Sequence, residues 1–473
     1  MITTMPGEVK MRYSQFLYAV SDFLTRKDWY AFGKTPEWIA NRVAELCSLA
    51  TTISGTDASR MDGHINSVIR ILESLFMSKA FTVDHAREAV ETHAGQVGFK
   101  CFTKADLAYH VYFGRGSGSP ETAAFNTLVT AFIDFFSRLL SGHSPEEAYA
   151  KLGLYGGDDG LAANPDVEPF IKAAELVGQE MEIEIIPRGA PGVNFLARFY
   201  SPSVWYGDPH NMCDIKRTLS GLHVTPHLPA NLKPIQKLAQ KLKSLSYTDA
   251  NTPIIADLVR TASRLNLSDV ERPELLGIIG SYWGQTAEHA WPNVPGDWMY
   301  DYVNAALPDF EWGRFLSALE ACTAPEDMLR LPLCCAPLDT HTPHKTDPYI
   351  VDGVLVQPRT AATTFGTPQE RVNAVSPPHA EDVTDIMADI VERILKSGSA
   401  ADAFMGVKLP PGVHSAELAP VKMKRINFHA RWAHKPGETL GDPVTTQDVP
   451  PVPLHVDTPR PSRMAESVEA VNV

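Results

Sequence analysis

The chain has few cysteines and no surplus of positive charge, and both shortages exclude classes of protein. Six cysteines are scattered along 473 residues, with no Cys-x-x-Cys pair and no histidine partner at zinc spacing. We therefore expect reduced thiols in a reducing compartment, and neither a disulfide framework nor a zinc site. These residues are Cys47, Cys101, Cys213, Cys322, Cys334 and Cys335. The net charge of −14 argues against unspecific coating of nucleic acid by the chain as a whole, although it permits a local basic groove.

Long apolar runs are also missing. No stretch approaches the roughly 20 consecutive apolar residues that cross a bilayer, and the N-terminus lacks the basic-then-apolar pattern of a secretory signal. We therefore expect an intracellular chain without a membrane span. With 44% hydrophobic and 21% charged residues, the composition is that of a globular protein, and the length suits more than one domain.

Hydrophobic periodicity predicts helices first and then a mixed region. Residues 11–24 and 36–49 have helical spacing, with WYAFGKTP as a turn between them, so residues 1–49 form a helical leading segment. Residues 50–207 alternate short strands with apolar helices. Within that region we expect NFLARFYSP, at 194–202, to form one strand.

The second half of the chain has a different pattern. Residues 208–335 are mostly helical, and their basic run KPIQKLAQKLKSL favours an amphipathic surface helix over the lining of an RNA exit path. Residues 336–473 are rich in Pro, Thr, His and Ala, which predicts a largely flexible extension with one helix at about 379–396. The basic and aromatic run KMKRINFHARW, at 422–432, lies in this extension, and we assign it no function.

Three polar segments between residues 50 and 207 fit a single site. They are TDASRMDG with Asp57 and Asp62, GSGSPETAAFN with Ser117, Gly118, Thr122 and Asn126, and GGDDG with Asp158 and Asp159. Taken singly, GGDDG suits a type I′ hairpin turn and GSGS suits a glycine linker before a proline-started helix. Taken together, they place carboxylates at the end of a strand and in a neighbouring hairpin. Such carboxylates repel one another unless a divalent cation lies between them.

Converging carboxylates of this kind suit phosphoryl transfer. Two Mg²⁺ ions about 3.5–4 Å apart can activate a 3′-hydroxyl for attack on an α-phosphate and bind the leaving pyrophosphate. Ligands that are all oxygen favour Mg²⁺ or Mn²⁺ over zinc. We expect Asp57 and Asp158 to bridge the ions and Asp159 to be a weaker or water-mediated ligand, which makes these three the catalytic and metal-binding residues.

Asp62 lies too far along the chain from Asp57 to share a metal readily. We expect it to accept a hydrogen bond from a sugar hydroxyl or to orient Asn126, whose amide can both donate to and accept from a ribose 2′-hydroxyl. Such a pair would select ribonucleotides, because a deoxyribose would leave its polar groups unpaired. The GSGS loop would let the backbone approach a nucleic-acid strand closely.

These segments resemble palm motifs A, B and C of viral RNA-dependent RNA polymerases. WYAFGKTP before them and NFLARFYSPSVWYGDP after them resemble nodavirus-like replicases, over about residues 10–225. The resemblance implies an α+β right-hand fold: a fingers remnant at 1–49, a ferredoxin-like antiparallel palm sheet with backing helices at 50–207, and a helical thumb at 208–335. It also implies RNA synthesis from NTPs on an RNA template and primer, with Mg²⁺ or Mn²⁺ as cofactor.

The same resemblance assigns roles to individual residues. Asp57 and Asp158 would bind the metals, and Asp62 and Asn126 would select ribose. The residues of the template- and sugar-contacting loop would be Ser117, Gly118 and Thr122, and those of the primer grip Phe195, Leu196 and Arg198, within residues 195–200.

The chain departs from the family pattern in two places. It begins too late to contain the basic fingers motif that grips the triphosphate, so we expect an incomplete or split replicase. An upstream polypeptide would supply the fingers and a membrane anchor at replication complexes in the host cytoplasm. Lys34 and Arg60 are the nearest substitutes for the triphosphate contacts. Where relatives place a lysine that protonates pyrophosphate, this chain has Glu182, so Arg188, a histidine or no residue takes that role.

Two alternatives to this assignment remain. A reverse transcriptase generally places an aromatic residue where Asp62 and Gly63 lie and has an aromatic-x-Asp-Asp hairpin, with which GGDDG disagrees. A catalytically silent RNA-binding or scaffold subunit of a replication complex agrees with the missing fingers and the negative charge. The intact acidic residues count against that second alternative.

Overall fold

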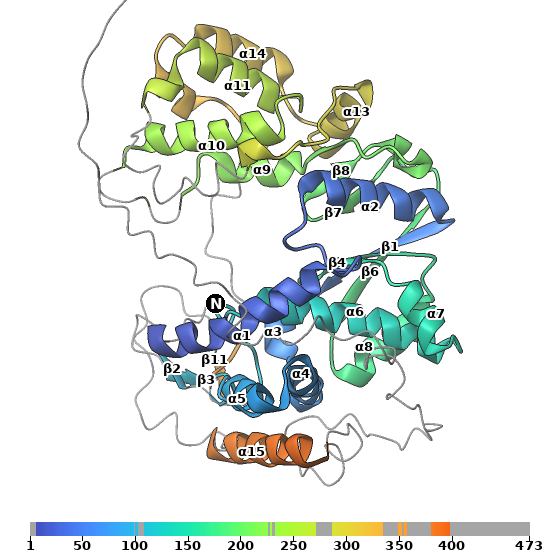
Figure 1. Cartoon of the computed structure of the whole chain (residues 1–473). Helices are drawn as coiled ribbons and strands as arrows, with labels where there is room; N and C mark the ends of the chain where they lie inside the picture. The colour runs from blue at the N-terminus through green and yellow to red at the C-terminus, as the bar shows by residue number, and fades with distance from the viewer. Residues whose placement is uncertain are drawn as a thin grey trace, which may run out of the picture. The chain divides into compact units, whose positions relative to one another are not determined.

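The computed structural model describes residues 6–98, 100–102, 108–225, 228, 232–270, 286–333, 349–351, 354–356 and 380–397. Helices and antiparallel sheets alternate along these residues, so the expected α+β class is confirmed (Figure 1). Cys334, Cys335 and the KMKRINFHARW run lie outside the described residues. The four cysteines inside them, Cys47, Cys101, Cys213 and Cys322, are buried free thiols, as expected.

A four-stranded antiparallel sheet carries the three polar segments. Its strands, in spatial order, are β4 (Leu154–Gly156), β5 (Asp159–Ala163), β1 (Thr52–Ala58) and β6 (Met181–Pro187). The register pairs Thr56 with Gly160 and Asp57 with Glu182. Gly160 permits the close approach of β1 and β5, because a Cβ there would lie 2.4 Å from the Thr56 hydroxyl.

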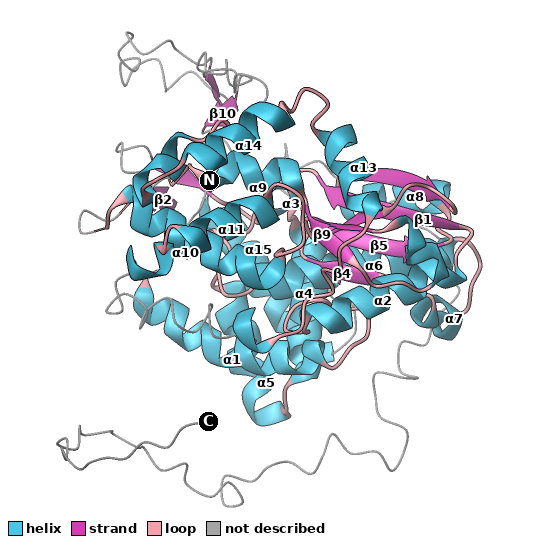
Figure 2. Ribbon diagram, turned by 90° about the horizontal axis from the view of Figure 1, so that it is seen from above, coloured by secondary structure: helices cyan, strands magenta, loops and turns pink. Residues whose placement is uncertain are grey.

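Helices cover both faces of this sheet because alternate residues of β1 point to opposite sides. On one side Ala58 packs with Val129 and Ile133 of α6 (Thr122–Leu140) and with α8 (Val167–Val177). On the other side Ile53 packs against α2 (Pro36–Leu49), which has the bounds that periodicity predicts. Figure 2 shows β1, β4 and β5 together, with α6 against them.

A second layer of helices backs the sheet. It contains α1 (Gly7–Thr25), α4 (Ser67–Ala80), α5 (Val83–Ala94) and α15 (Ala380–Ser397). The predicted helix of the C-terminal extension is thus confirmed, and it packs against α4 and α5 through Met387, Ile390 and Ile394 (Figure 1). The shorter elements are α3 (Met61–His64), β2 (Lys100–Phe102), β3 (Ala108–His110), α7 (Pro145–Ala150), β10 (Tyr349–Val351) and β11 (Val354–Val356).

The segment 194–202 was predicted as one strand, and this prediction was wrong. It forms a hairpin of β7 (Val193–Phe195) and β8 (Arg198–Tyr200), to which β9 (Asn211–Cys213) adds a third antiparallel strand. Leu196 and Ala197 form its two-residue turn with φ of +48° and +57°. Such turns normally use Asn or Gly, so Leu-Ala gave no turn signal in the sequence.

The described residues between 208 and 333 are mostly helical, as predicted for 208–335. After the 3₁₀ helix η1 (Pro202–Tyr206), its helices are α9 (Ile215–Leu222), α10 (Pro234–Thr248), α11 (Ile255–Arg264), α13 (Asp297–Ala306) and α14 (Trp312–Ala321), with 3₁₀ turns η2 (Leu267–Val270) and η4 (Pro325–Arg330). Phe199 of β8 enters their apolar core and stacks on Tyr302 with ring centroids 3.8 Å apart. The basic run at 233–245 is an amphipathic helix, since Ile235, Leu238 and Leu242 are buried.

One helix, α6, bears on the expectation that the chain has no membrane span. Among the described helices, α6 alone is long and apolar enough to cross a membrane by length and composition. In the structure 61% of that window is buried, and α6 packs against α8, β4 and β5. This is the burial of a core helix.

Candidate active site

The end of β1 opens into a hollow of about 210 Å³ that is lined by carboxylates. Asp57 and Asp159 line it, with Glu182 and Glu184 on the neighbouring strand. The β1–β5 register, which pairs Thr56 with Gly160, takes Asp57 to Asp159 one residue further on. Two of the three predicted metal-binding carboxylates therefore lie on adjacent strands at one end of the sheet.

Asp158 occupies the tip of the β4–β5 hairpin. The turn consists of Gly157 and Asp158, and only Gly157 has a positive φ (+75°), which is the pattern of a type II′ turn and not of the type I′ turn suggested by the sequence. Helix α6 fixes this turn from both sides. The Gly157 N–H donates to the Thr127 hydroxyl at 2.8 Å, and the Thr130 hydroxyl donates to the Gly157 carbonyl at 2.9 Å.

The WYAFGKTP segment supports the same hairpin. The backbone N–H of Tyr155 donates to the Trp29 carbonyl at 2.8 Å, and that of Ala31 donates to the Tyr155 carbonyl at 2.9 Å. The side chain of Tyr155 is also held, because its hydroxyl donates to Asp134 of α6 at 2.5 Å. The acidic turn is therefore held by the leading segment and by α6 together.

Two carboxylates at this site, Asp158 and Asp159, have raised pKa values. Partial burial raises the pKa of Asp159 to about 6, and the charges of Asp158 and Asp57 add to this effect while Arg217 of α9 opposes it. Loss of hydration, followed by the charges of Asp57 and Asp62, also raises the pKa of Asp158. No ion pair of Asp57, Asp158 or Asp159 occurs within the described part of the chain. Among the described residues, no salt bridge therefore compensates this negative charge, and Arg217 acts on it only through its electrostatic field.

The chemical types of these ligands suit a hard divalent cation, although the side chains do not yet surround a common metal position. Asp57, Asp158 and Asp159 offer only carboxylate oxygens, which are the ligands preferred by Mg²⁺ and Mn²⁺, and their mutual repulsion is the effect that a cation would relieve. Among residues that the structure describes, no group of three or more His, Cys, Asp or Glu side chains is already arranged to hold a metal ion.

The predicted ribose-selecting pair is formed. The Asn126 amide nitrogen donates to Asp62 Oδ1 at 2.9 Å, and the Ser117 hydroxyl donates to Asp62 Oδ2 at 2.5 Å. Asp62 lies at the start of α3, just after Arg60, whose φ is +52°. The negative charge of Asp62 acts on Asp158, so the pair lies near the acidic turn.

The two other predicted loop residues, Thr122 and Gly118, differ in whether they are free to contact a ligand. The Thr122 hydroxyl donates to the Ser119 carbonyl at 3.0 Å and to the Gly116 carbonyl at 3.3 Å, so it closes the loop onto the first turn of α6. Gly118 is partly exposed in that loop. Thr122 therefore fixes the loop, whereas the Gly118 backbone is accessible.

A buried ionic cluster behind this pair was not found from the sequence. Arg70 and Glu73 of α4, Arg115, Glu121 and His93 have side chains with no exposed surface. Arg115 Nη1 lies 2.7 Å from Glu121, Arg70 Nη1 donates to Glu121 at 2.9 Å and to Glu73 at 3.0 Å, and Arg115 Nη2 donates to Glu73. No motif predicts the cluster, because the contacts of Arg70 with Glu121 and of Arg115 with Glu73 join residues far apart in sequence.

The cluster controls the charge states of its members. Burial alone would raise the pKa of Glu73, yet Arg115, Arg70 and His93 outweigh it and lower that pKa to about 2. Burial alone would lower the pKa of His93, but its hydrogen bonds to Glu121 and Glu73 and their charges raise it. The cluster therefore keeps its carboxylates ionised and favours the protonated imidazole.

The predicted primer-grip hairpin touches the acidic hairpin. Leu196 packs on Gly156, where a Cβ would lie 2.9 Å from the Leu196 Cδ2 atom, and Phe195 lines the acidic hollow. Arg198 forms a bidentate pair with the buried Asp249, at 3.0 and 3.1 Å, and its guanidinium lies 5.2 Å from the centre of the Trp291 ring. The structure thus brings Leu196 and Phe195 to the site, whereas Arg198 joins the hairpin to the helical region.

Two of the residues considered as substitutes for basic groups, Lys34 and Arg188, have other partners. The Lys34 ammonium lies 4.3 Å from the centre of the Trp38 ring. Arg188 donates to the backbone carbonyls of Cys47, Ser48 and Ala50 at 2.9–3.2 Å and to that of Trp205 at 2.6 Å, so its guanidinium is occupied in holding the chain. Glu182 pairs with Asp57 across the sheet.

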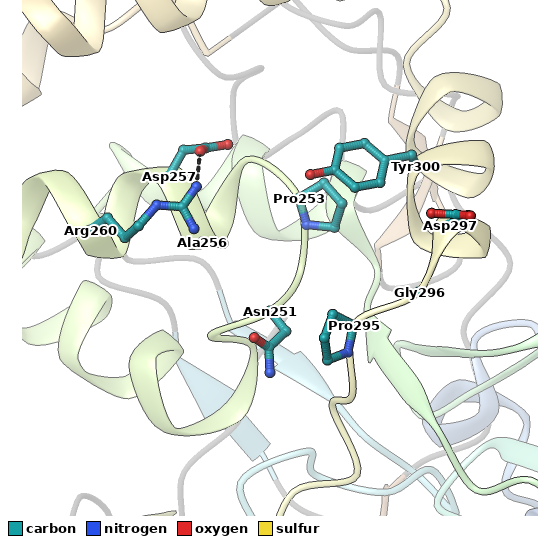
Figure 3. Close-up of a pocket in the computed structure, with 9 residues that line it drawn as sticks. All are labelled: Asn251, Pro253, Ala256, Asp257, Arg260, Pro295, Gly296, Asp297 and Tyr300. Carbon is teal, nitrogen blue, oxygen red and sulfur yellow. Dashed lines mark hydrogen bonds and ion pairs between the residues drawn. The ribbon is translucent and has the colours of Figure 1, made fainter.

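A second hollow lies in the helical region and contains none of the predicted residues. It measures about 340 Å³ and is bounded by α11 and α13, with the Asp257–Arg260 ion pair on one side and Tyr300 on the other (Figure 3). Its lining consists of Asn251, Pro253, Ala256, Asp257, Arg260, Pro295, Gly296, Asp297 and Tyr300.

Comparison with known proteins gives sequence relatives of one kind. A region of 333 residues, 68% of this chain, is 28% identical to the RNA-directed RNA polymerase of Atlantic halibut nervous necrosis virus, of which it covers 33%. A region of 277 residues, 56% of the chain, is 30% identical to the RNA-directed RNA polymerase of Pariacoto virus, of which it covers 27%. The chain thus spans about a third of the length of the curated relatives it matches.

The comparisons with family models and with solved structures give less information about this chain than the sequence relatives do. No family model matches the chain. Among solved structures, the insertion-loop deletion mutant of the RNA-dependent RNA polymerase of a human picorbirnavirus gives a TM-score of 0.48 at 16% identity, covering 62% of this chain and 59% of that one. The resemblance to nodavirus RNA-directed RNA polymerases, which the three motifs and the two flanking segments indicated, is confirmed by sequence similarity, over 68% of the chain in the case of the halibut virus enzyme.

Proposed function

We propose that this chain is the catalytic part of an RNA-dependent RNA polymerase that joins NTPs on an RNA template. The observation that carries the proposal is the convergence of Asp57, Asp158 and Asp159 at one end of the sheet, beside the Asp62–Asn126 pair. The names of the sequence relatives agree with it. We assign residues 50–207 to a palm, 208–335 to a thumb, 1–49 to a fingers remnant and 336–473 to a C-terminal extension.

In this proposal Asp57, Asp158 and Asp159 hold Mg²⁺ or Mn²⁺. The bound ions would supply activation of the 3′-hydroxyl and neutralisation of charge on the α-phosphate and the pyrophosphate. The turn contacts made by Thr127 and Thr130 fix Asp158 before substrate arrives. Preorganised groups of this kind cost little reorganisation during the reaction.

The nucleotide and the nascent strand would contact different residues. Asp62 keeps lone pairs that can accept from a 2′-hydroxyl, while Asn126 keeps one N–H to donate, since its second N–H is used by Asp62. Gly118 in the loop can approach the sugar and template through its backbone. The hairpin tip formed by Phe195 and Leu196 would support the 3′ end of the primer, and Arg198 would anchor that hairpin.

Arg217 is a further residue that we assign to RNA. It is exposed on α9, it acts electrostatically on Asp159, and no ion pair of its guanidinium occurs among the described residues. A cation facing an acidic hollow suits a backbone phosphate of the template–product duplex. We further propose that a polypeptide outside this chain supplies triphosphate-binding basic residues and a membrane anchor at cytoplasmic replication complexes.

Primer extension tests the proposal. The purified chain, alone and with a fingers-bearing polypeptide of a relative, is incubated with primed RNA, NTPs and Mg²⁺ or Mn²⁺. We expect templated extension by the wild type and loss of at least 10³-fold in Asp158→Ala, because a metal-binding carboxylate is removed. The matched control Asp208→Ala lies outside the site and should retain activity.

Two results would contradict the assignment. Equal incorporation by Asp158→Ala and wild type would point to a contaminating enzyme. No extension under any of these conditions, together with retained RNA binding, would favour the silent RNA-binding or scaffold subunit.

A further inference from the structure

Arg115 touches the ribose-selecting pair from behind. Its Nε donates to Asn126 Oδ1 at 2.7 Å and lies 3.8 Å from Asp62 Oδ1. The side chain of Arg115 has no exposed surface, whereas that of Asp62 is 25% exposed. Arg115 can therefore reach Asn126 and Asp62 but not a nucleotide in solution.

The contacts leave one orientation for the Asn126 amide. Its oxygen faces the Arg115 N–H and its nitrogen faces the Asp62 carboxylate. A flipped amide would place an N–H₂ group against the Arg115 donor and a carbonyl oxygen against the Asp62 anion, so both contacts would become repulsive. The free N–H of Asn126 consequently points in one fixed direction.

Arg115 is itself fixed by buried anions. Its two terminal nitrogens pair with Glu121 and Glu73, and Glu121 is the residue directly before α6, the helix that carries Asn126. Tyr13 donates to Glu121 from α1. A guanidinium whose two terminal nitrogens are already held loses little further freedom when its third nitrogen, Nε, orients Asn126.

We propose that Arg115 is a positioning residue for ribose discrimination, which acts by holding the Asn126 amide and leaves the polymerisation machinery otherwise unchanged. The inference rests on the proposed function. It predicts a change in selectivity between sugars, whereas a merely structural role predicts an equal loss with both sugars.

The cluster contains a matched control. Arg70 is equally buried and neutralises the same two glutamates, but its remaining donors bind the backbone carbonyls of Phe113 and Gly114 at 2.9 and 3.0 Å. Arg70 makes no contact with Asn126 or Asp62 among its described hydrogen bonds. Arg115→Lys and Arg70→Lys each keep the buried positive charge and lose the planar fork.

The experiment measures kcat/KM for UTP and for dUTP on a primed RNA template, together with Tm. Arg115→Lys should lower the UTP/dUTP ratio about five- to tenfold, the effect of losing roughly one orienting hydrogen bond. Arg70→Lys should lower Tm to a similar extent and keep the wild-type ratio. In an Asn126→Ala background, Arg115→Lys should have no further effect on the ratio, because its target is gone.

A second variant covers the case in which Arg115→Lys does not fold. Glu73→Gln with Arg115→Met removes one buried cation and one buried anion, so the cluster keeps its charge balance while Asn126 loses its donor. It should lower the ratio like Arg115→Lys.

The outcomes separate the two proposals. An active wild type whose ratio is unchanged in both Arg115 variants, or is changed equally by Arg70→Lys, overturns the role of Arg115 alone. A wild type without templated synthesis overturns the proposed function, and the ratio is then undefined.

Discussion

Asp159→Asn should make the metal-free protein more stable near neutral pH. The pKa of Asp159 is raised from 3.8 to about 6, first by burial and then by Asp158 and Asp57. A difference of this size corresponds to about 3 kcal/mol of penalty on the folded ionised form. Asp159 is partly exposed, so we expect solvent screening to reduce the gain to about 1–2 kcal/mol.

The sign of the pH dependence follows from the raised pKa. The folded state holds the proton of Asp159 more tightly than the unfolded state does, so stability falls as pH rises from about 4 to about 6 and the penalty is complete above that range. Asparagine mimics the protonated acid at every pH. The variant should therefore gain stability at about pH 8 and gain almost none at about pH 4.

Thermal unfolding in EDTA measures this effect. We expect the Tm of Asp159→Asn to exceed that of the wild type by a few degrees at about pH 8, because 1 kcal/mol moves Tm by roughly 2–4 °C in a domain of this size class. Asp22→Asn, at an exposed position of α1, is the matched control and should leave Tm unchanged. Added Mg²⁺ should raise the Tm of the wild type more than that of the variant.

An equal or lower Tm of Asp159→Asn at about pH 8 would refute the reasoning. A gain that persists at about pH 4 would show that the effect comes from packing or hydrogen bonding and not from charge. Either result would show that repulsion between the carboxylates of the acidic hollow does not destabilise the folded protein.

Four further substitutions test three separate features. Ala197→Gly should stabilise the protein by about 1 kcal/mol in urea denaturation, because Ala197 is exposed at a φ of +57° and glycine carries no steric cost there; a loss of stability would contradict this. His93→Gln should flatten the pH dependence of Tm: the raised pKa of His93 gives stability that is present below about pH 6.5 and lost as pH rises through the folded value, so an unchanged profile would argue against it. Asn126→Ala and Asp62→Ala should relax sugar selection, seen as increased use of dTTP relative to UTP, and a wild-type preference in both would remove them from the sugar site.

The elements that the sequence predicted are those that depend on local pattern. The periodicity of residues 36–49 predicts α2 with its observed bounds, and the one helix expected at about 379–396 is α15, Ala380–Ser397. The pairing of Asp62 with Asn126 also followed from residue type and spacing. The helix bounds needed no knowledge of which distant segments meet, whereas Asp62 and Asn126 lie 64 residues apart and were paired on their residue types.

The features that were missed depend on tertiary contacts. Arg115 was an ordinary basic residue beside a glycine-rich loop until the fold brought Glu73 and Glu121 to its guanidinium. The β7–β8 hairpin was missed because its turn consists of Leu196 and Ala197, residue types that rarely adopt the positive φ found here. The packing of Leu196 on Gly156 offsets the conformational cost of this turn. In both cases a local rule is overruled by a contact between segments far apart in sequence.

Helix α6 carries Asn126, which donates to Asp62, and within the next turn it holds the acidic turn through Thr127 and Thr130. A rigid shift of this helix would carry both features along together and preserve their spacing. Insertion of a single residue after Asn126 would instead rotate the two groups by about 100° relative to each other. The relative position of the two groups is thus unaffected by a rigid displacement of the helix, but it depends on the number of residues between Asn126 and Thr130.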